Sequence, residues 1–153
     1  MVSIALYQPD IPQNAGNILR LAACLGMSVH IIGPAGFDFS DRSIRRAGMD
    51  YIGEVEIVRH SGWIAFRGWQ AGSGSRLVLI TTHGTTPYTS FGFAPTDVLL
   101  FGRESAGVPE TVHESVDARL LIPMRPGLRS LNVASAAAMV AGEALRQTGG
   151  LAA

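Results

Sequence analysis

Short apolar segments alternate along the chain with stretches of helical periodicity. Continuous apolar runs predict strands at Ser3–Tyr7, Val29–Ile32, Val55–Val58, Leu77–Thr81, Val98–Phe101 and Leu120–Ile122. Runs of this kind, apolar at successive positions rather than at every second one, are typical of parallel strands that are covered on both faces. Strands that alternate with helices therefore predict an α/β fold, with a parallel sheet and helices on both of its faces.

Helical periodicity places helices between these strands. We expect them from Asn14 to Leu25, Asp41 to Ala47, Gly62 to Ala71, in a short segment beginning at Pro109, and from Leu131 to Gln147. Asn14 is the expected N-cap of the first helix, because a side-chain oxygen there accepts an orphan backbone N–H. Gly26 is its expected stop residue.

The last helix has almost no polar face before its final turn, which predicts burial on most sides. Ser130 or Asn132 can cap it, and the Pro/Gly loop before it carries Arg125 and Arg129. Two more polar loops follow the predicted strands that end at Thr81 and Phe101. Because ligands bind at the carboxyl ends of strands in open α/β sheets, we expect these three loops to form one site.

Length and composition fit one domain covering residues 1–153, of which 47% are hydrophobic. No apolar run approaches the roughly 18–20 residues that span a membrane, and the N-terminus lacks the basic region of a signal peptide. We therefore expect a cytoplasmic protein without a membrane segment. The single cysteine, Cys24, gives no disulfide framework and is expected to be a small buried hydrophobic residue.

The formal net charge is zero, which argues against a strongly basic nucleic-acid binder but allows a local basic patch. All twelve basic residues are arginine, whose forked donors suit phosphate groups. Arg42, Arg45 and Arg46 share one helical face. They form either a phosphate-binding patch or a solvated helix face with an Asp41–Arg45 pair.

Several common sites have no support. The segment Gly102–Gly107 has the glycine spacing of a phosphate loop, but no Lys-Ser/Thr follows it. No dinucleotide fingerprint follows the first strand, no G-x-S-x-G elbow is present, and the four scattered histidines predict surface or loop packing instead of a metal site. What remains is a pocket of backbone groups walled by Ile80, Ile122 and Leu131, which suits an adenosine-type ligand.

Three motifs in order resemble those of the SPOUT superfamily. They are P-x-N-x-G-N-x-x-R from Pro12 to Arg20, G-x-E-x-x-G-x-P from Gly102 to Pro109, and I-P-M…S-L-N from Ile122 to Asn132. Their spacing, the chain length and the RRAG-D-Y run from Arg45 to Tyr51 are most similar to tRNA (cytidine(34)-2′-O)-methyltransferases. Each motif alone is weak, whereas the three in order are specific and span nearly the whole chain.

This resemblance implies a C-terminal trefoil knot that holds S-adenosylmethionine, and an obligate homodimer with its active site at the subunit interface. It implies 2′-O-methylation of tRNA at nucleotide 34, the wobble position, with no metal. The cofactor would contact Ile80, Gly102, Ile122 and Ser130, with Leu131 beside it. Arg42, Arg45 and Arg46 would contact phosphates of the anticodon stem.

The resemblance also assigns catalytic roles. Arg20 would assist deprotonation of the ribose hydroxyl, although a pKa above ~12 makes arginine a reluctant base. Arg20 would otherwise hold a phosphate or stabilise the alkoxide. Glu104 and Asn132 would orient the reacting groups. The chain departs from the family pattern at Gly142, where close relatives usually carry Tyr, and at Ala134, where many carry Ser.

Three other functions stay open at this point. One is 2′-O-methylation at position 32 of tRNA or on ribosomal RNA, and a second is N1-methylation of guanine by an enzyme of the same fold. The third is a non-catalytic RNA-binding dimer. The presence of Arg20, Ser130 and Asn132 counts against the third, because a binding protein does not need the whole set.

Overall fold

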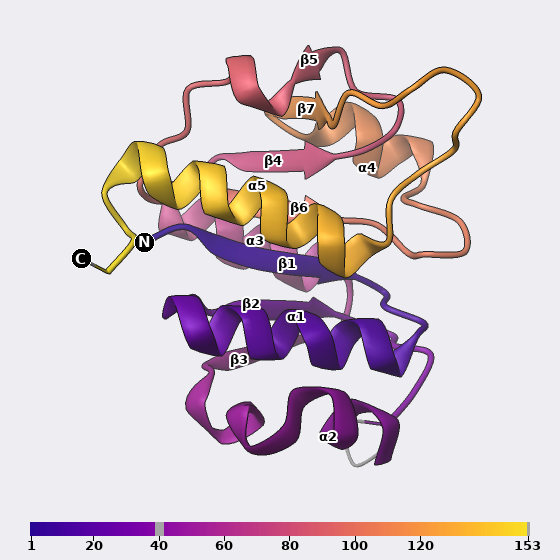
Figure 1. Cartoon of the computed structure of the whole chain (residues 1–153), viewed down its shortest axis with the longest axis vertical. Coiled ribbons are helices and arrows are strands. Elements are labelled where there is room, and N and C mark those ends of the chain that lie inside the picture. Colours follow the sequence, from indigo (N-terminus) through magenta and orange to yellow (C-terminus); the bar gives the residue numbers. More distant parts are fainter. Residues whose placement is uncertain (39–41, 153) are drawn as a thin grey trace.

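The computed structural model of the chain describes residues 1–38 and 42–152 (Figure 1). In chain order, the elements are β1 (Ser3–Tyr7), α1 (Pro12–Leu25), β2 (Val29–Ile32), α2 (Arg42–Gly48), the 3-10 helix η1 (Met49–Glu54), β3 (Ile57–His60), α3 (Trp63–Ser73), β4 (Leu77–Ile80), β5 (Thr86–Pro87), the 3-10 helix η2 (Tyr88–Ser90), β6 (Val98–Phe101), α4 (Glu110–Ser115), β7 (Ala118–Leu121) and α5 (Val133–Thr148). The predicted helix start at Asp41 lies outside the described residues.

All seven strands belong to one parallel sheet, in the order β3-β2-β1-β6-β4-β7-β5. The central strands β1, β2 and β6 are buried at every position, as the continuous apolar runs predict. The predicted parallel sheet is confirmed. Its order brings β7 next to β4, although β6 and α4 lie between them in the sequence.

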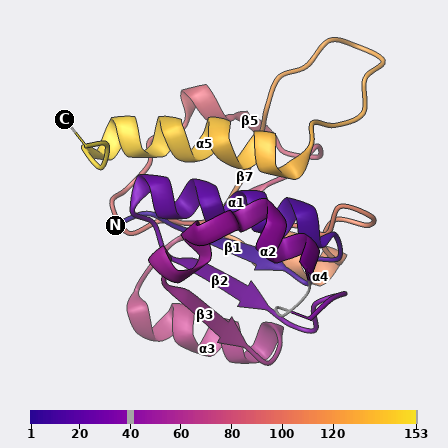
Figure 2. The same cartoon turned by 60° about the horizontal axis from the view of Figure 1, so that its bottom comes forward.

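Helices cover both faces of the sheet (Figures 1 and 2). Successive residues of β1 point to opposite faces, so Ile4 and Leu6 join the cluster that contains α1 and α5, while Ala5 and Tyr7 join the cluster that contains α3 and α4. Ile44 of α2 is fully buried in the first cluster. Burial of one such side chain stabilises the fold by about 2–3 kcal/mol, which fastens α2 against α1.

The helix ends only partly follow the predictions. Asn132 caps α5, because its Oδ1 accepts hydrogen bonds from the N–H groups of Ala134 (2.9 Å) and Ser135 (3.3 Å). Gly26 ends α1 in the left-handed conformation, as predicted. Asn14 does not cap α1, since the helix already begins at Pro12, whose fixed backbone and missing N–H suit a first helical position.

Strand positions differ from the predictions at β3, β4, β5 and β7. β4 ends at Ile80, one residue before the predicted Thr81. β3 occupies Ile57–His60 instead of Val55–Val58, because Val29 pairs with Ile57 while Val55 packs on the core from outside the strand. β7 begins two residues early, at Ala118. The two-residue edge strand β5 lies in a segment that we predicted as a polar loop, where pairing with β7 outweighs the weak local strand signal.

Two burial predictions were wrong. Cys24 is exposed, because it is not on the buried face of α1, which includes Ala22. Helix α5 buries one side only, at Ala137, Val140, Ala141, Ala144 and Leu145. On its opposite side Ala138 is exposed and Met139 is 41% exposed. The rest of the chain therefore does not bury all the apolar residues of α5.

Internal partners satisfy the polar groups at the amino edge of the sheet. Asp97 is fully buried and accepts hydrogen bonds from Arg76 Nε (2.8 Å) and Nη2 (2.7 Å) and from the N–H of Ala94 (2.8 Å). Asp117 accepts from the N–H of Leu77 at 2.7 Å. These contacts join the starts of β4, β6 and β7, and leave the carboxyl edge for function.

A pair of histidines lies on the α3 side of the sheet. His30, only 3% exposed, shares a 2.9 Å hydrogen bond between its Nδ1 and Nε2 of His60, and its ring lies 4.1 Å from that of Trp69. We expected all four histidines to pack at the surface or in loops, so the buried position of His30 corrects that prediction. Burial, with a smaller effect of His60, lowers the pKa of His30 to about 4.

We predict that this pair makes folding stability depend on pH. The folded protein binds a proton at His30 more weakly than the unfolded chain does, so the stabilisation is present above pH 6.5 and is lost as the pH falls toward 4. Between pH 7 and 4, the free energy of unfolding should fall by about 3 kcal/mol more for wild type than for His30→Gln. Urea unfolding at several pH values measures this difference, and parallel curves for the two proteins would contradict it.

Candidate active site

The three polar loops meet at one large pocket. A cavity of about 1060 Å³ lies at the carboxyl ends of β4, β6 and β7, and the loops after these strands form most of its wall. Ile11 and Asn14 line it from the start of α1, and Ala136 lines it from α5. The predicted convergence of the loops is therefore confirmed, at the edge where open α/β sheets bind ligands.

Backbone packs against backbone at two places in this wall. A Cβ on Gly102 would lie 2.7 Å from the carbonyl carbon of Gly107, because the loop after β6 folds back as a narrow turn. The N–H and C=O groups of Arg103 and Gly107 exchange hydrogen bonds of 3.0 and 2.8 Å across that turn. The glycines thus let peptide groups, instead of side chains, face the pocket.

The second close approach joins the loop after β4 to β7. A Cβ on Gly84 would lie 2.5 Å from the carbonyl carbon of Leu120. The N–H of Thr81 donates to Leu120 O (2.9 Å), and the N–H of Thr85 donates to Arg119 O (3.2 Å). This loop therefore runs directly over the backbone of β7 and holds one wall of the pocket in place.

A side-chain hydrogen bond joins the first and third motifs. Asn132 Nδ2 donates to Oδ1 of the buried Asn14 at 3.0 Å, across 118 positions of the sequence. Asn132 also caps α5 with its own Oδ1, so both ends of its amide are used. This arrangement fixes the entrance to α5 relative to α1 and places Asn132 in the pocket wall.

Glu104 lies against a carboxylate that the sequence predictions missed. The N–H of Asp10 donates to Glu104 Oε2 at 3.4 Å, and the hydroxyl of Ser105 donates to Asp10 Oδ2. Burial, followed by hydrogen bonding to the Asp10 side chain, raises the pKa of Glu104, while hydrogen bonding to the Glu104 side chain lowers the pKa of Asp10.

The two carboxyl groups thus affect each other in opposite directions, because their interaction favours the proton on Glu104 and the charge on Asp10. Oδ1 of Asp10 is buried and has no hydrogen-bond donor among the described residues. Asp10 could have been found from the sequence, because it follows β1 at the same carboxyl edge.

All five predicted cofactor residues line the pocket. Ile80 and Ile122 come from the ends of β4 and β7, Gly102 follows β6, and Ser130 and Leu131 precede α5. Arg125 and Arg129 line the same cavity. Five residues spread over fifty-two positions of the chain are thus brought together by the adjacent carboxyl ends of three strands.

Arg20 is not among the residues that line this pocket. It is exposed on α1, and its guanidinium carbon lies 5.1 Å above the ring of Tyr51. A cation–π contact of this kind holds the side chain beside η1. The structure therefore brings together two of the three predicted catalytic residues, Glu104 and Asn132, and leaves the third on a neighbouring surface of the same chain.

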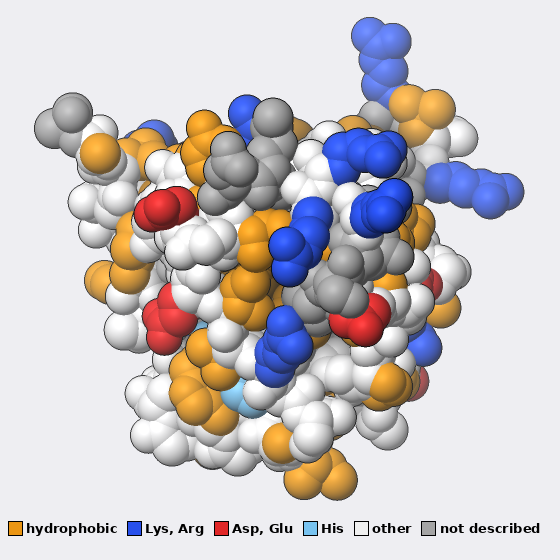
Figure 3. Space-filling view, turned by 90° about the horizontal axis from the view of Figure 1, so that it is seen from below, with side chains coloured by type: hydrophobic (Ala, Val, Ile, Leu, Met, Phe, Trp, Pro, Cys, Tyr) orange, Lys and Arg blue, Asp and Glu red, His pale blue; other side chains and the backbone are white. Residues whose placement is uncertain are grey.

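The three arginines of α2 are all exposed. Figure 3 views the molecule from the α2 side and shows arginine side chains gathered on one part of this face, whereas acidic side chains are scattered. The alternative of an Asp41–Arg45 pair lies outside the described residues. A neutral protein thus carries an uneven surface charge that a phosphate backbone would complement.

Residues 1–38 and 42–152 contain neither a candidate metal site nor a membrane-spanning helix. Among these residues no group of three or more His, Cys, Asp or Glu side chains could hold a metal ion. In the same ranges no helix has both the length and the apolar composition needed to cross a membrane.

Known proteins resemble the chain over nearly its whole length. A relative from Beijerinckia indica named tRNA (cytidine(34)-2′-O)-methyltransferase is 64% identical, over 97% of this chain and 93% of its own. Another of the same name from Escherichia coli is 40% identical, over 97% and 95%.

Solved structures of methyltransferases are also similar to this chain. One, reported as giving structural insights into the 2-OH methylation of C/U34 on tRNA, superposes with a TM-score of 0.92 at 42% identity, covering 96% of this chain and 95% of that one. An AdoMet-bound rRNA methyltransferase from Sinorhizobium meliloti gives 0.88 at 28% identity, covering 95% of this chain and 56% of that one. The model of the SpoU rRNA Methylase family matches residues 1–142, and the chain therefore belongs to that family.

Proposed function

We propose that this protein transfers a methyl group from S-adenosylmethionine to the 2′-oxygen of nucleotide 34 in tRNA. The observation that carries the proposal is the pocket into which the three family motifs bring Asn14, Gly102 and Asn132 together. The names of relatives up to 64% identical support the choice of tRNA. We also propose that the protein acts in the cytoplasm, where a tRNA substrate would be found, and that residues 1–153 act as one SPOUT methyltransferase domain.

The pocket fits an adenosine-containing cofactor. Its glycine turn presents peptide groups, which can recognise an adenine edge, and Ile80 and Ile122 supply apolar walls for the ring. Ser130 and Leu131 would close the other side. When bound, S-adenosylmethionine supplies an electrophilic methyl group. We further propose that the segment from β7 to α5 forms a trefoil knot around this site, which the crossing of Gly84 over Leu120 supports.

The protein's own task is to position a ribose hydroxyl and accept or direct its proton. A 2′-hydroxyl is a weak nucleophile, so holding it at near-attack distance supplies much of the rate. Asn132, fixed by Asn14, would orient the ribose, and Glu104, paired with Asp10, would hold the neighbouring polar groups. Arg20 would stabilise the oxygen as its proton leaves, or bind the adjacent phosphate.

We propose that Arg20 reaches the pocket of a partner subunit in a homodimer. Within one chain Arg20 does not line the pocket, which a second copy would explain. The apolar exposed side of α5 supports this arrangement, since Ala138 is exposed and Met139 is 41% exposed. At Gly142 no atom lies within 4 Å of a Cβ position, so a larger residue would also fit within one chain. At position 134, Ala in place of Ser removes one hydroxyl group near Asn132, the cap of α5.

The first prediction concerns chemistry and substrate. Purified protein with labelled S-adenosylmethionine and undermodified bulk tRNA should yield a 2′-O-methylated pyrimidine at the wobble position, detected by nuclease digestion and nucleoside mass spectrometry. Label on another ribose would keep the enzyme class but move the target to another tRNA position or to ribosomal RNA. Label on guanine N1 would replace the proposed chemistry, and tRNA binding without label would favour a binding protein.

In the same assay, Arg20→Ala should lose methylation by at least a hundredfold while the affinity for S-adenosylmethionine stays within about twofold. The expected split arises because Arg20 acts on the ribose and lies outside the cofactor pocket. Isothermal titration of the cofactor provides the control measurement. Substantial retained turnover would remove the proposed role of Arg20.

We expect the α2 arginines to contribute to tRNA binding. Reversing the charge at both Arg45 and Arg46 to Glu should weaken tRNA binding about tenfold or more and reduce its dependence on salt, because fewer counterions are released. Filter binding at several salt concentrations measures both effects, with cofactor affinity as the control. Unchanged affinity and an unchanged salt slope would identify α2 as a solvated helix face.

We expect the proposed dimer to depend on the apolar side of α5. Sedimentation equilibrium should report two chains per particle for wild type and for Met139→Leu, which keeps the apolar side of α5. Met139→Arg should give one chain per particle and lose methylation, because a charge would be buried at the interface. A wild-type protein that methylates tRNA as a single chain would contradict the shared active site.

A further inference from the structure

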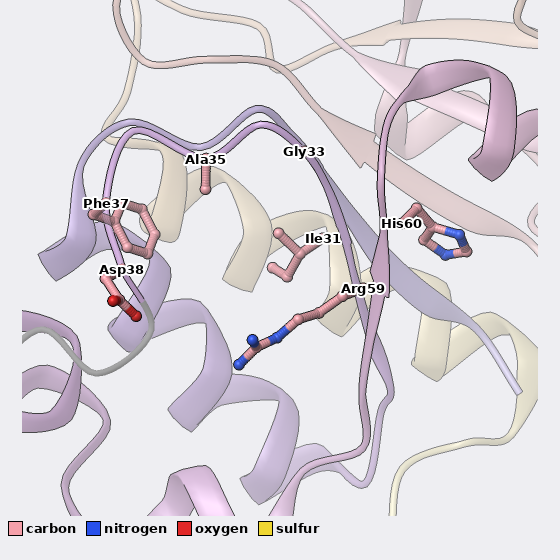
Figure 4. Close-up of a pocket in the computed structure, with 7 residues that line it drawn as sticks. All are labelled: Ile31, Gly33, Ala35, Phe37, Asp38, Arg59 and His60. Carbon is pink, nitrogen blue, oxygen red and sulfur yellow. The ribbon is translucent and has the colours of Figure 1, made fainter.

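A second cavity lies at the carboxyl edge of the sheet, away from the proposed cofactor pocket. It has a volume of about 440 Å³ and lies at the ends of β2 and β3, lined by Ile31, Gly33, Ala35, Phe37, Asp38, Arg59 and His60 (Figure 4). It shares no lining residue with the larger pocket. Neither the proposed reaction nor the α2 arginines make use of it.

The strand register decides which side chains face this cavity. Ile31 pairs with Arg59 in the sheet, and Ile31 belongs to the core cluster beneath α1 and α2, so Arg59 lies on that same face. His60, the next residue, turns to the opposite face toward His30. Figure 4 shows the Arg59 side chain extended along the cavity toward Asp38 and Phe37.

The side chains that line the cavity could bind the phosphate, the base and the ribose of a nucleotide. The Arg59 guanidinium offers a planar fork of donors that suits a phosphate. Phe37 packs against the core, which holds its ring in place, and an aromatic ring of this kind can stack on a base. The carboxylate of Asp38, which is exposed, can accept hydrogen bonds from an amino group of a base or from a ribose hydroxyl.

The position of the cavity favours RNA over a free small molecule. β2 and β6 are two strand spacings apart and β3 and β4 are four apart, which is roughly 10–19 Å along the carboxyl edge. A strand of RNA lying along this edge would reach both cavities. The exposed arginines of α2 follow Phe37 and Asp38 in the sequence, and Figure 3 shows arginine side chains gathered on the face seen from the α2 side.

We propose that this cavity is a second RNA subsite, which binds a nucleotide flanking the methylated one, with its phosphate on Arg59 and its base against Phe37. The inference rests on the proposed function, since it takes RNA as the substrate. The subsite would hold the strand on one side of the target ribose, so that the reacting nucleotide enters the larger pocket in a fixed orientation.

The test compares two charge reversals that change the net charge of the protein equally. Arg59→Glu should weaken tRNA binding about tenfold and reduce the salt slope, because one phosphate contact is lost. Arg67→Glu, on α3 at the opposite face of the sheet, should change tRNA affinity less than twofold. Arg59→Gln should fall between wild type and Arg59→Glu, and all three variants should bind S-adenosylmethionine as wild type does.

A substrate series then locates the nucleotide. Anticodon stem-loops with one neutral methylphosphonate at successive positions beside the target should include one that weakens wild-type binding several-fold but leaves Arg59→Gln unaffected, because the two changes remove the same contact. If the effects of the methylphosphonate and of Arg59→Gln on binding simply add at every position, the proposed subsite is wrong.

The outcomes separate the two proposals. If wild type binds and methylates tRNA but Arg59→Glu behaves as Arg67→Glu does, the subsite alone is wrong. If wild type binds S-adenosylmethionine but no tRNA, both the proposed substrate and the subsite are wrong. Thermal unfolding of Arg59→Gln should match wild type, which separates loss of an RNA contact from loss of the fold.

Discussion

The site depends on two places where backbone packs directly on backbone at the carboxyl edge of the sheet. Gly84 crosses Leu120 and Gly102 faces Gly107, and at each place an added Cβ would lie under 3 Å from a peptide atom. Peptide planes cannot move aside as a flexible side chain can. These contacts therefore hold the three loops close together and let main-chain donors and acceptors form the pocket wall.

Polar groups divide between the two edges of the sheet. At the amino edge, Asp97 and Asp117 take up arginine and backbone donors inside one chain, so that edge is closed. At the carboxyl edge, the Asn132 amide bonds to Asn14 and to the start of α5, and Glu104 accepts a hydrogen bond from the N–H of Asp10. The closed edge supplies rigidity, and the open edge presents polar groups that are already oriented before a ligand binds.

Surface composition indicates how one chain relates to its partners. Zero net charge does not prevent an arginine-rich face, because position and not total charge determines the local field. Helix α5 shows the same principle for apolar groups. Its inner side fills the core, whereas Ala138 and Met139 on its outer side are exposed in one chain, which supports the proposed second copy.

The sequence by itself determined the parallel α/β architecture, most element positions and the three loops of the site, because burial on both strand faces imposes continuous apolar runs. It also indicated Asn132 as a possible cap, since capping is a local interaction. Only the tertiary structure decided the strand order that brings β7 beside β4, the buried position of His30, and the pairing of Asp10 with Glu104. It also decided that Arg20 lies outside its own pocket. These features join residues far apart in the chain, and local periodicity carries no information about such contacts.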